Sequence, residues 1–290
     1  PISTPYSFLG PHLILDDRNM SLELVFLGTA AALQLPSFHC TCEVCEAARN
    51  DPGQRRTRAS VALLGEETVL IDAGPDLESQ LEREAIRRVD RIFLTHWHFD
   101  HVWGLAALGE PASHEPWPPT DIYLPSQIVD TFNQQLWYMA SQVELHPVEP
   151  GDVIELPDAS WEVVKTKHTD HSVGYIIESN RRVAYLVDTA HPPEATMDRL
   201  SDLDLLILDA TIDEIVYREG EARWNEFSLP EAVEFWRQVG AERCILTHLG
   251  CHRWIEGKLL AGLSHSERVE YEDRVDNLRF AFDGMLLILE

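Results

Sequence analysis

The sequence predicts an α/β fold, and three observations carry this prediction. From Leu22 onward, short apolar or alternating runs that read as strands alternate with segments of helical spacing. Polar residues of the metal-ligand type directly follow several of the strand-like runs, which is typical of folds whose sites collect at the carboxyl ends of strands. The chain has 290 residues, 44% of them hydrophobic, which is enough to bury the core of a single compact domain.

The expected strands are short runs rich in aliphatic and aromatic residues, and the expected helices show apolar residues three or four positions apart. In chain order, the strands are expected near Leu22 and at Val69–Ile71, Arg91–Thr95, Trp161–Lys165, Val183–Val187, Leu205–Asp209 and Arg243–Thr247. The helices are expected at Val44–Arg49, Leu77–Glu84, Val102–Leu108, Ile128–Met139, Pro192–Leu200, Leu229–Val239 and Glu267–Val275. The two runs Leu278–Phe282 and Met285–Leu289, joined at Asp283-Gly284, predict a closing hairpin.

Residues 20–290 are therefore expected to form one domain. The segment Pro1–Asn19 lacks a clear pattern and is interpreted as an extension, either an added segment or a processed leader. The proline-rich stretch Gly109–Thr120, which contains His114, predicts an excursion that faces the substrate.

The charge balance of the chain limits its possible partners. There are 49 acidic and 23 basic residues, which gives a net charge of −26. Such a surface repels polyanions, so a long nucleic acid gripped along its backbone is not expected, whereas a small anion drawn to bound cations is. No apolar run approaches the length of about 20 residues that a membrane span needs. Without a signal-peptide pattern, the expected location is cytoplasmic.

The run His96-Trp97-His98-Phe99-Asp100-His101 is the most informative stretch of the chain. It places four potential metal ligands in the spacing HxHxDH on a loop between an expected strand and an expected helix. His96 and His98 can face one side of a tight loop while Asp100 and His101 face the other. This arrangement favours two adjacent cations over one tetrahedral centre.

Three further candidate ligands follow other expected strands: His168, Asp188 and His248. A carboxylate such as Asp188 can bridge two cations, and the histidines complete the coordination of each. Two alternatives stay open from the residues alone. Asp188 could instead be the N-cap of a helix at Pro192–Leu200, and His171 competes with His168 as the ligand.

The cysteines indicate a second kind of metal site. Cys40, Cys42 and Cys45 form a CxCxxC triplet after the first expected strand, and Cys251 lies three residues after His248. The chain has five cysteines, an odd number, so a secreted disulfide framework is the weaker interpretation. Four thiolates would complete a tetrahedral structural zinc. The fifth cysteine, Cys244, lies within an apolar run and is expected to be a buried thiol.

In this order the motifs resemble those of the metallo-beta-lactamase superfamily over nearly all of Leu22–Leu289. Asp188 lies in a VDTA segment, His248 in an ILTH segment, and Asp72 in a segment similar to the family's LIDAG element. The resemblance implies a four-layer αββα sandwich in which Asp72 braces the metal loop. It also implies the following ligand sets: His96, His98 and His168 for one metal, Asp100, His101 and His248 for the other, and Asp188 as the bridge.

The cysteine triplet and a late FDGM motif at Phe282–Met285 resemble the phosphoribosyl 1,2-cyclic phosphate phosphodiesterases of the carbon–phosphorus lyase pathway. That resemblance implies a dinuclear centre with manganese or zinc, one structural zinc and a possible homodimer. The fourth zinc ligand in that family is a histidine, so His39 and His252 compete with Cys251. The pyrroloquinoline quinone biosynthesis protein has a similar layout but lacks the full catalytic set, so the intact HxHxDH favours an enzyme.

The chain departs from those phosphodiesterases at the group thought to assist the leaving group. The expected strand Leu205–Asp209 is not followed by a histidine, and Glu226 occupies the place of the histidine that relatives show before their xSL segment. Glu226 is therefore the first candidate for this role, with Asp213 and His171 as alternatives. Glu226, His171 and the ligand Asp100 are counted as catalytic candidates.

These observations together predict a metal-dependent phosphodiesterase. The expected substrate is a small, anionic and cyclic phosphodiester, attacked in line by a hydroxide that bridges the two metals. One alternative is a lactonase or thioesterase on the same dinuclear scaffold, where the same nucleophile attacks a carbonyl. A second alternative, from another class, is a non-catalytic binding or carrier protein of this fold.

Overall fold

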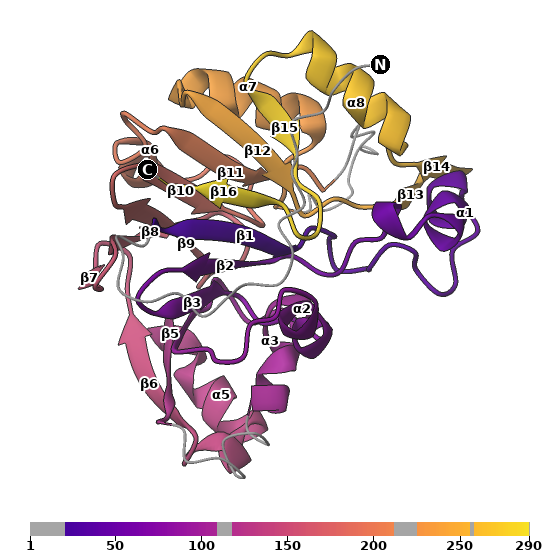
Figure 1. The fold of residues 1–290 in the computed structure, drawn as a ribbon. Helices are drawn as coiled ribbons and strands as arrows, with labels where there is room; N and C mark the ends of the chain where they lie inside the picture. Colours follow the sequence, from indigo (N-terminus) through magenta and orange to yellow (C-terminus); the bar gives the residue numbers. More distant parts are fainter. Residues whose placement is uncertain (1–20, 109–117, 212–224, 256–257, 290) are drawn as a thin grey trace.

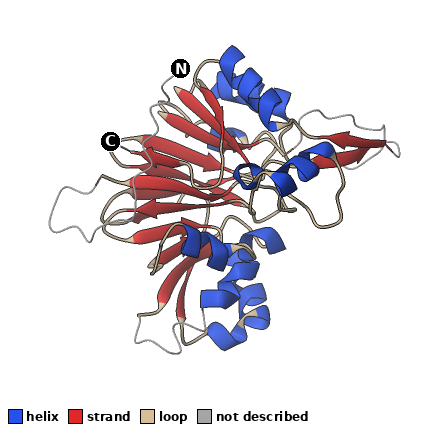
Figure 2. Ribbon diagram, turned by 45° about the vertical axis from the view of Figure 1, so that its right-hand side comes forward, coloured by secondary structure: helices blue, strands red, loops and turns tan. Residues whose placement is uncertain are grey.

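The computed structural model describes residues 21–108, 118–211, 225–255 and 258–289. Two seven-stranded sheets pack face to face, and helices cover the outer face of each sheet (Figures 1 and 2). This arrangement is the predicted four-layer αββα sandwich. The segments Pro1–Asn19 and 109–117, and with them His114, lie outside the described residues.

The first sheet contains the amino-terminal strands and one strand from the end of the chain. Its order is β16 (Leu286–Ile288), β1 (Glu23–Gly28), β2 (Ser60–Leu64), β3 (Thr68–Ile71), β4 (Arg91–Phe93), β5 (Thr120–Pro125) and β6 (Val143–Val148). The pairs from β3 to β6 are parallel, so the carboxyl ends of β3 and β4 reach the same edge.

The second sheet contains most of the carboxy-terminal half. Its order is β15 (Leu278–Phe280), β12 (Arg243–Thr247), β11 (Leu205–Asp209), β10 (Arg182–Leu186), β9 (Val173–Glu178), β8 (Ser160–Lys165) and β7 (Val153–Glu155). A separate hairpin, β13 (His252–Ile255) with β14 (Lys258–Ala261), projects beside α1 (Glu43–Asn50) (Figure 2).

The remaining described helices are short. The α-helices are α2 (Leu77–Arg83), α3 (Phe99–Val102), α5 (Val129–Gln135), α6 (Glu194–Met197), α7 (Leu229–Val239) and α8 (His265–Arg274). The 3₁₀ helices are η1 (Pro52–Gln54), η2 (Trp103–Leu105), η3 (Ser126–Ile128) and η4 (Trp137–Met139). Among the described helices, none is both long and apolar enough to cross a bilayer.

Three apolar cores hold the four layers together. The core between the sheets contains a stack of aromatic rings in which Phe93 lies 4.2 Å from Trp161 and 4.5 Å from Tyr123, measured between ring centroids. A second core joins the first sheet to α2 and α5, and a third joins the second sheet to α7. Each sheet is thus buried on both faces, which explains why many of its strands read as continuous apolar runs.

Helix α7 shows how local sequence sets the boundaries of an element. The Ser228 hydroxyl and the Glu231 carboxylate form a reciprocal capping box at its start. Gly240 ends the helix with a left-handed backbone, φ 76°. Because both signals are visible in the sequence, the expected helix Leu229–Val239 agrees with the structure to the residue.

Two sequence expectations about local structure are wrong. The runs at residues 278–282 and 285–289 do not form a hairpin, because β15 pairs in parallel with β12 in one sheet while β16 pairs with β1 in the other. The turn at Asp283-Gly284 therefore connects the two sheets. The helix expected from Val102 begins earlier, at Phe99, so Asp100 and His101 lie in its first turn.

Glycine at position 74, in the turn after β3, allows the loop that carries the HxHxDH residues to approach this turn closely. A Cβ atom on Gly74 would lie 2.0 Å from the Asp100 backbone oxygen. Such contact is impossible without moving one of the two backbones. The loop that carries the HxHxDH ligands is thus packed directly on the turn after β3.

We expect Gly74→Ala to lower the free energy of unfolding by about 1–3 kcal/mol, because the new methyl group overpacks a backbone contact. Thermal and urea unfolding would measure this change. The matched control is Gly53→Ala, since a Cβ there would meet only the Asp51 side chain, at 3.3 Å. Equal unfolding midpoints for the two variants would contradict the proposed close approach.

Candidate metal centre

Asp72 organises the loop that carries the HxHxDH ligands. Its carboxylate is fully buried and accepts hydrogen bonds from the Thr95 backbone N–H (2.8 Å) and from the Thr95 hydroxyl. It also lies 2.7 Å from His101 Nδ1. Asp72 therefore contacts both the start and the end of the loop, which is the bracing position that the LIDAG resemblance implies.

The other candidate ligands come from the ends of three strands of the second sheet. His168 follows β8, Asp188 follows β10 and His248 follows β12. Asp188 and His248 have left-handed backbones, with φ of 56° and 55°, as does Asp72 with 62°. Such conformations are uncommon for residues other than glycine and turn these side chains out of their strands toward one edge of the sandwich.

The structure gathers all seven predicted ligands at this edge into two groups that share Asp188. In each group the potential ligand atoms lie within 4.8 Å of one another. The first group is His96, His98, His168 and Asp188, and the second is Asp100, His101, His248 and Asp188. The grouping is the one that the family resemblance implies. Asp188 is not the N-cap of α6, which is Pro193.

Hydrogen bonds at one ring nitrogen fix the orientation of four of the histidines. The Nδ1 partners are Thr95 Oγ1 for His96 (2.9 Å), Asp72 Oδ2 for His101 (2.7 Å), the Asn225 backbone oxygen for His168 (3.0 Å) and Thr211 Oγ1 for His248 (2.9 Å). Because Nδ1 is engaged, the rings of His96, His101 and His168 present Nε2 to the centre. His248 faces the centre with both nitrogens, since its Nδ1 also lies 3.0 Å from Asp188 Oδ1. His98 differs, since its Nδ1 lies 3.0 Å from His168 Nε2.

The atoms that face the centre lack the hydrogen-bond partners that buried polar atoms need. Among the described residues, four such buried atoms have no partner: Nε2 of His96, His101 and His248, and Oδ1 of Asp188. His101 Nε2 lies 3.0 Å from Asp188 Oδ2, but the two are not aligned for a hydrogen bond. Buried polar atoms left unpaired are costly, and divalent cations fit this donor set of imidazoles and carboxylates.

Electrostatics favour a cation at the same place. Burial opposes charge on Asp188, but His248 and His101 hold the pKa of its carboxyl well below the usual value. Burial also opposes charge on His101, yet Asp72 and Asp100 raise the pKa of its ring well above the usual value. The carboxylates are thus anionic and attract positive charge. Bound metal ions would replace the protons on these rings.

The catalytic candidates differ in their contacts with the ligand groups. Glu226 is half-buried, and the Thr211 hydroxyl, which also contacts His248, is one of its hydrogen-bond partners. His171 is half-buried on the loop after His168 but, within the described chain, makes no hydrogen bond or ion pair with the ligands. Asp213 lies outside the described residues.

Two supporting residues were not found from the sequence. Asn225 forms two hydrogen bonds with His168. Its backbone oxygen lies 3.0 Å from His168 Nδ1, and its side-chain amide donates to the His168 backbone oxygen at 2.9 Å. Asp209 is fully buried at the end of β11 and accepts from the backbone N–H groups of Thr189 and Phe227. Only the position of Asp209 at the carboxyl end of an apolar strand could have indicated it.

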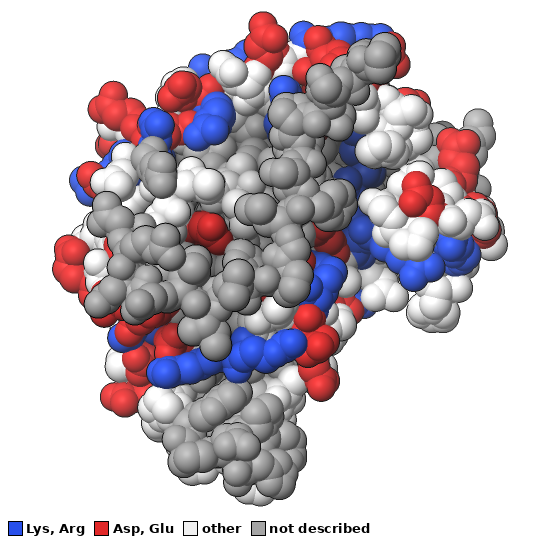
Figure 3. Space-filling model, in the orientation of Figure 1, with Lys and Arg blue, Asp and Glu red and all other residues white. Residues whose placement is uncertain are grey.

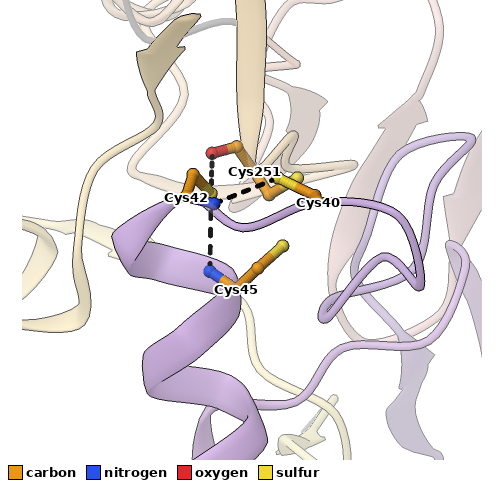
Figure 4. Close-up of side chains that lie close together, drawn as sticks. All are labelled: Cys40, Cys42, Cys45 and Cys251. Carbon is orange, nitrogen blue, oxygen red and sulfur yellow. Dashed lines mark hydrogen bonds between the residues drawn. The ribbon is translucent and has the colours of Figure 1, made fainter.

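The four predicted cysteines form a second, separate group. Cys40, Cys42, Cys45 and Cys251 are buried, and their sulfur atoms lie within 4.8 Å of one another (Figure 4). Backbone N–H groups of Cys42 and Cys45 point at the sulfurs of Cys40 (3.4 Å) and Cys42 (3.5 Å). Such N–H contacts stabilise thiolates.

Burial raises the pKa of the Cys42 thiol to about 11 and that of Cys251 further, so these two thiols would ionise only with a cation beside them. Of the competing ligands, His39 is exposed, and its Nδ1 lies 3.1 Å from the Ser37 hydroxyl. The side chain of His252 lies outside the described part of the structure. Cys244 is buried within β12, as expected.

Known proteins are similar to this chain in sequence and in fold. Residues 67–249 match the family model of the beta-lactamase superfamily domain. Coenzyme PQQ synthesis protein B of Methylobacterium radiotolerans is 30% identical over 238 residues, which cover 69% of this chain and 77% of that protein.

Two solved structures extend the comparison to the whole fold. A diphosphatase from the PhnP family is 28% identical with a TM-score of 0.77, and the match covers 93% of this chain and 98% of that one. Zinc-bound PqqB from Methylobacterium extorquens is 22% identical with a TM-score of 0.75, over 91% and 99% of the two chains, and shares the fold. This chain resembles the PhnP family, and it belongs to the metallo-beta-lactamase superfamily.

Proposed function

We propose that this protein is a metal-dependent hydrolase that cleaves a small, cyclic phosphodiester. The observation that carries the proposal is the complete set of seven ligands in two groups that share Asp188. The similarity to a diphosphatase of the PhnP family supports phosphorus as the atom attacked. The similarity to coenzyme PQQ synthesis protein B suggests another role in the same fold, but the intact ligand set favours hydrolysis.

Two divalent cations, manganese or zinc, would supply a nucleophile from water at neutral pH and neutralise charge on the phosphoryl oxygens. The chain's own residues set where this happens. His98 is exposed, whereas His96 and His101 are buried, so the centre opens to solvent on the His98 side. Asp188 contributes the one carboxylate that both groups share and therefore fixes the spacing between them.

Glu226 is the residue that we propose assists the leaving group. Burial and the nearby Asp188 carboxylate raise the pKa of Glu226 to about 7, so its carboxyl can hold a proton near neutral pH. Bound cations would lower this pKa and so reduce the fraction of Glu226 that is protonated at neutral pH. His171 is the second candidate for the same role.

The charge of the protein supports a small substrate. Acidic and basic side chains are interspersed on the face shown in Figure 3, and the net charge of −26 opposes binding of an extended polyanion. A small phosphodiester would instead be attracted locally by the cations. A homodimer remains part of the proposal.

A substrate panel combined with metal analysis tests the proposed function. Purified protein loaded with manganese or zinc would be assayed with cyclic and linear phosphodiesters, a lactone and a thioester. We expect turnover of the phosphodiesters and two metals at the HxHxDH site. Turnover of the lactone or thioester alone would replace the proposal with the corresponding carbonyl chemistry, and no turnover with full metal occupancy would favour a binding protein.

We expect Asp188→Ala to lower hydrolysis by about a thousandfold or more, because both metal sites lose the shared carboxylate. Metal content should fall while circular dichroism stays that of a folded protein. Asp204→Ala, directly before β11, is a control for removal of an aspartate beside the same sheet. Turnover at the wild-type rate in Asp188→Ala would refute the dinuclear site.

For Glu226→Gln we expect a loss of about a hundredfold with an alkyl leaving group and little loss with a nitrophenolate, which leaves without a proton. The acid acts only when protonated, so the wild-type rate with the alkyl substrate should fall as pH rises through the pKa of Glu226. This fall should vanish in the glutamine variant. Equal losses for both substrates would exclude Glu226 as the acid.

We also propose that Cys40, Cys42, Cys45 and Cys251 hold a structural zinc. Four thiolates leave no open position for chemistry, so this metal would act through stability alone. Cys251→Ser should release about one zinc per chain and lower the melting temperature by about 5 °C or more. Cys244→Ser makes the same chemical change away from the cluster and should release none. A disulfide between two of the four cysteines in undamaged protein would disprove this site.

A further inference from the structure

Asp209 connects the two segments that carry the proposed bridging ligand and the proposed acid. Its Oδ1 accepts from the Thr189 backbone N–H at 3.0 Å, and its Oδ2 accepts from the Phe227 backbone N–H at 2.9 Å. Thr189 directly follows Asp188, and Phe227 directly follows Glu226. One carboxylate therefore determines where both segments lie.

Further hydrogen bonds connect the same two segments through the loop that carries His168. The Thr189 hydroxyl accepts from the Lys167 backbone N–H at 2.9 Å, and the Ala190 N–H donates to the Lys167 oxygen, also at 2.9 Å. His168 and Asn225 then bond to each other twice. Because Asn225 precedes Glu226 and Phe227, these bonds form a closed ring of described residues, and Asp209 is the carboxyl side chain whose hydrogen bonds close it.

We propose that Asp209 is a positioning residue that fixes Glu226 relative to Asp188. It is fully buried, and its two side-chain oxygens each accept a hydrogen bond from a backbone N–H group, one from each of the two segments. The inference rests on the proposed phosphodiesterase function, in which Asp188 is the bridging ligand and Glu226 the acid.

The alternative is that Asp209 only caps the end of β11 and has no role in positioning Glu226. Asp204, at the other end of the same strand, allows the two roles to be compared. At the other end of β11, Asp204 accepts from the Arg182 backbone N–H at 2.8 Å and pairs with Arg181 at 2.8 Å. Asp204 performs a capping task far from the ligand groups. Asp204→Asn is therefore a matched control for Asp209→Asn.

Asp209→Asn is isosteric, but its amide group places N–H where one oxygen accepted a hydrogen bond. Hydrogen exchange followed by mass spectrometry reads the result without any activity assay. We expect exchange in the peptides around Thr189 and Phe227 to rise together by about tenfold or more, because the two segments share one anchor. The control Asp204→Asn should leave both peptides unchanged. Unchanged exchange, or a rise in only one of the two peptides, would overturn the inference.

Kinetics separate positioning from general stability. In Asp209→Asn, hydrolysis of an alkyl phosphodiester should fall by about tenfold or more while a nitrophenyl diester is affected less than about threefold, as for Glu226→Gln. The double variant should be no slower than Glu226→Gln alone, because the acid has already been removed. Multiplied losses in the double variant, or equal losses for both substrates, would show that Asp209 does not act through Glu226.

Two further measurements keep these outcomes distinct. If wild-type protein hydrolyses no phosphodiester, the proposed function fails while the exchange experiment still decides whether Asp209 anchors both segments. If Asp209→Asn does not fold, Asn225→Ala, which removes the amide that donates to the His168 oxygen but keeps the bond made by the Asn225 backbone oxygen, weakens the same ring. The Asn225→Ala variant should then show the same preference for the nitrophenyl substrate. If this preference is absent, the inference is wrong.

Discussion

The requirement to satisfy buried carboxylates governs the edge of the sandwich where the ligands meet. Asp72, Asp100 and Asp188 are each at most 5% exposed, and together they lie among five histidine rings. Asp72 is satisfied by the protein alone, through Thr95 and His101. Asp188 is not, because one of its oxygens has no hydrogen-bond partner among the described residues. Asp72 thus orients a candidate ligand, and Asp188 has an oxygen available to bind cations.

The two sheets make this concentration of charge possible. Parallel pairing brings the ends of β3 and β4 to one edge of the first sheet, and the ends of β10, β11 and β12 reach the same edge of the second. The core of aromatic and aliphatic side chains between the sheets holds these ends in register. Left-handed backbones at Asp72, Asp188 and His248 then turn each side chain inward. These backbone conformations are unfavourable, and the rigid strands beside them hold them in place.

The sequence was sufficient to predict which residues gather into the two groups, because the motifs that contain them are local. HxHxDH, and a His or Asp after an apolar run, are patterns of a few neighbouring residues, and the order of the motifs indicated the family. The closing hairpin could not be judged in this way. Two apolar runs and an Asp-Gly turn have the same local pattern whether the strands pair with each other or, as here, β15 and β16 enter different sheets.

The supporting residues were missed for a related reason. Asn225 and Asp209 act through backbone groups that are distant in the chain, and a backbone N–H leaves no mark in a sequence. The start of α3 was placed late because this helix has four residues, two of them the candidate ligands Asp100 and His101, which is too few to show an apolar periodicity. The start of this helix could therefore not be predicted from its residue pattern, although it carries two of the candidate ligands.

The cysteine group and the ligand groups are also linked through the backbone. His248 and Cys251 are three residues apart, and the Leu249 N–H between them donates to the Thr29 oxygen at 2.9 Å while the Ala31 N–H donates to the Leu249 oxygen. The chain from Thr29 leads directly into the cysteine triplet. The segment that holds the candidate ligand His248 is therefore fixed on one side by the sheet and on the other by the cysteines. A metal bound at the cysteines would stabilise the position of His248 without taking part in chemistry.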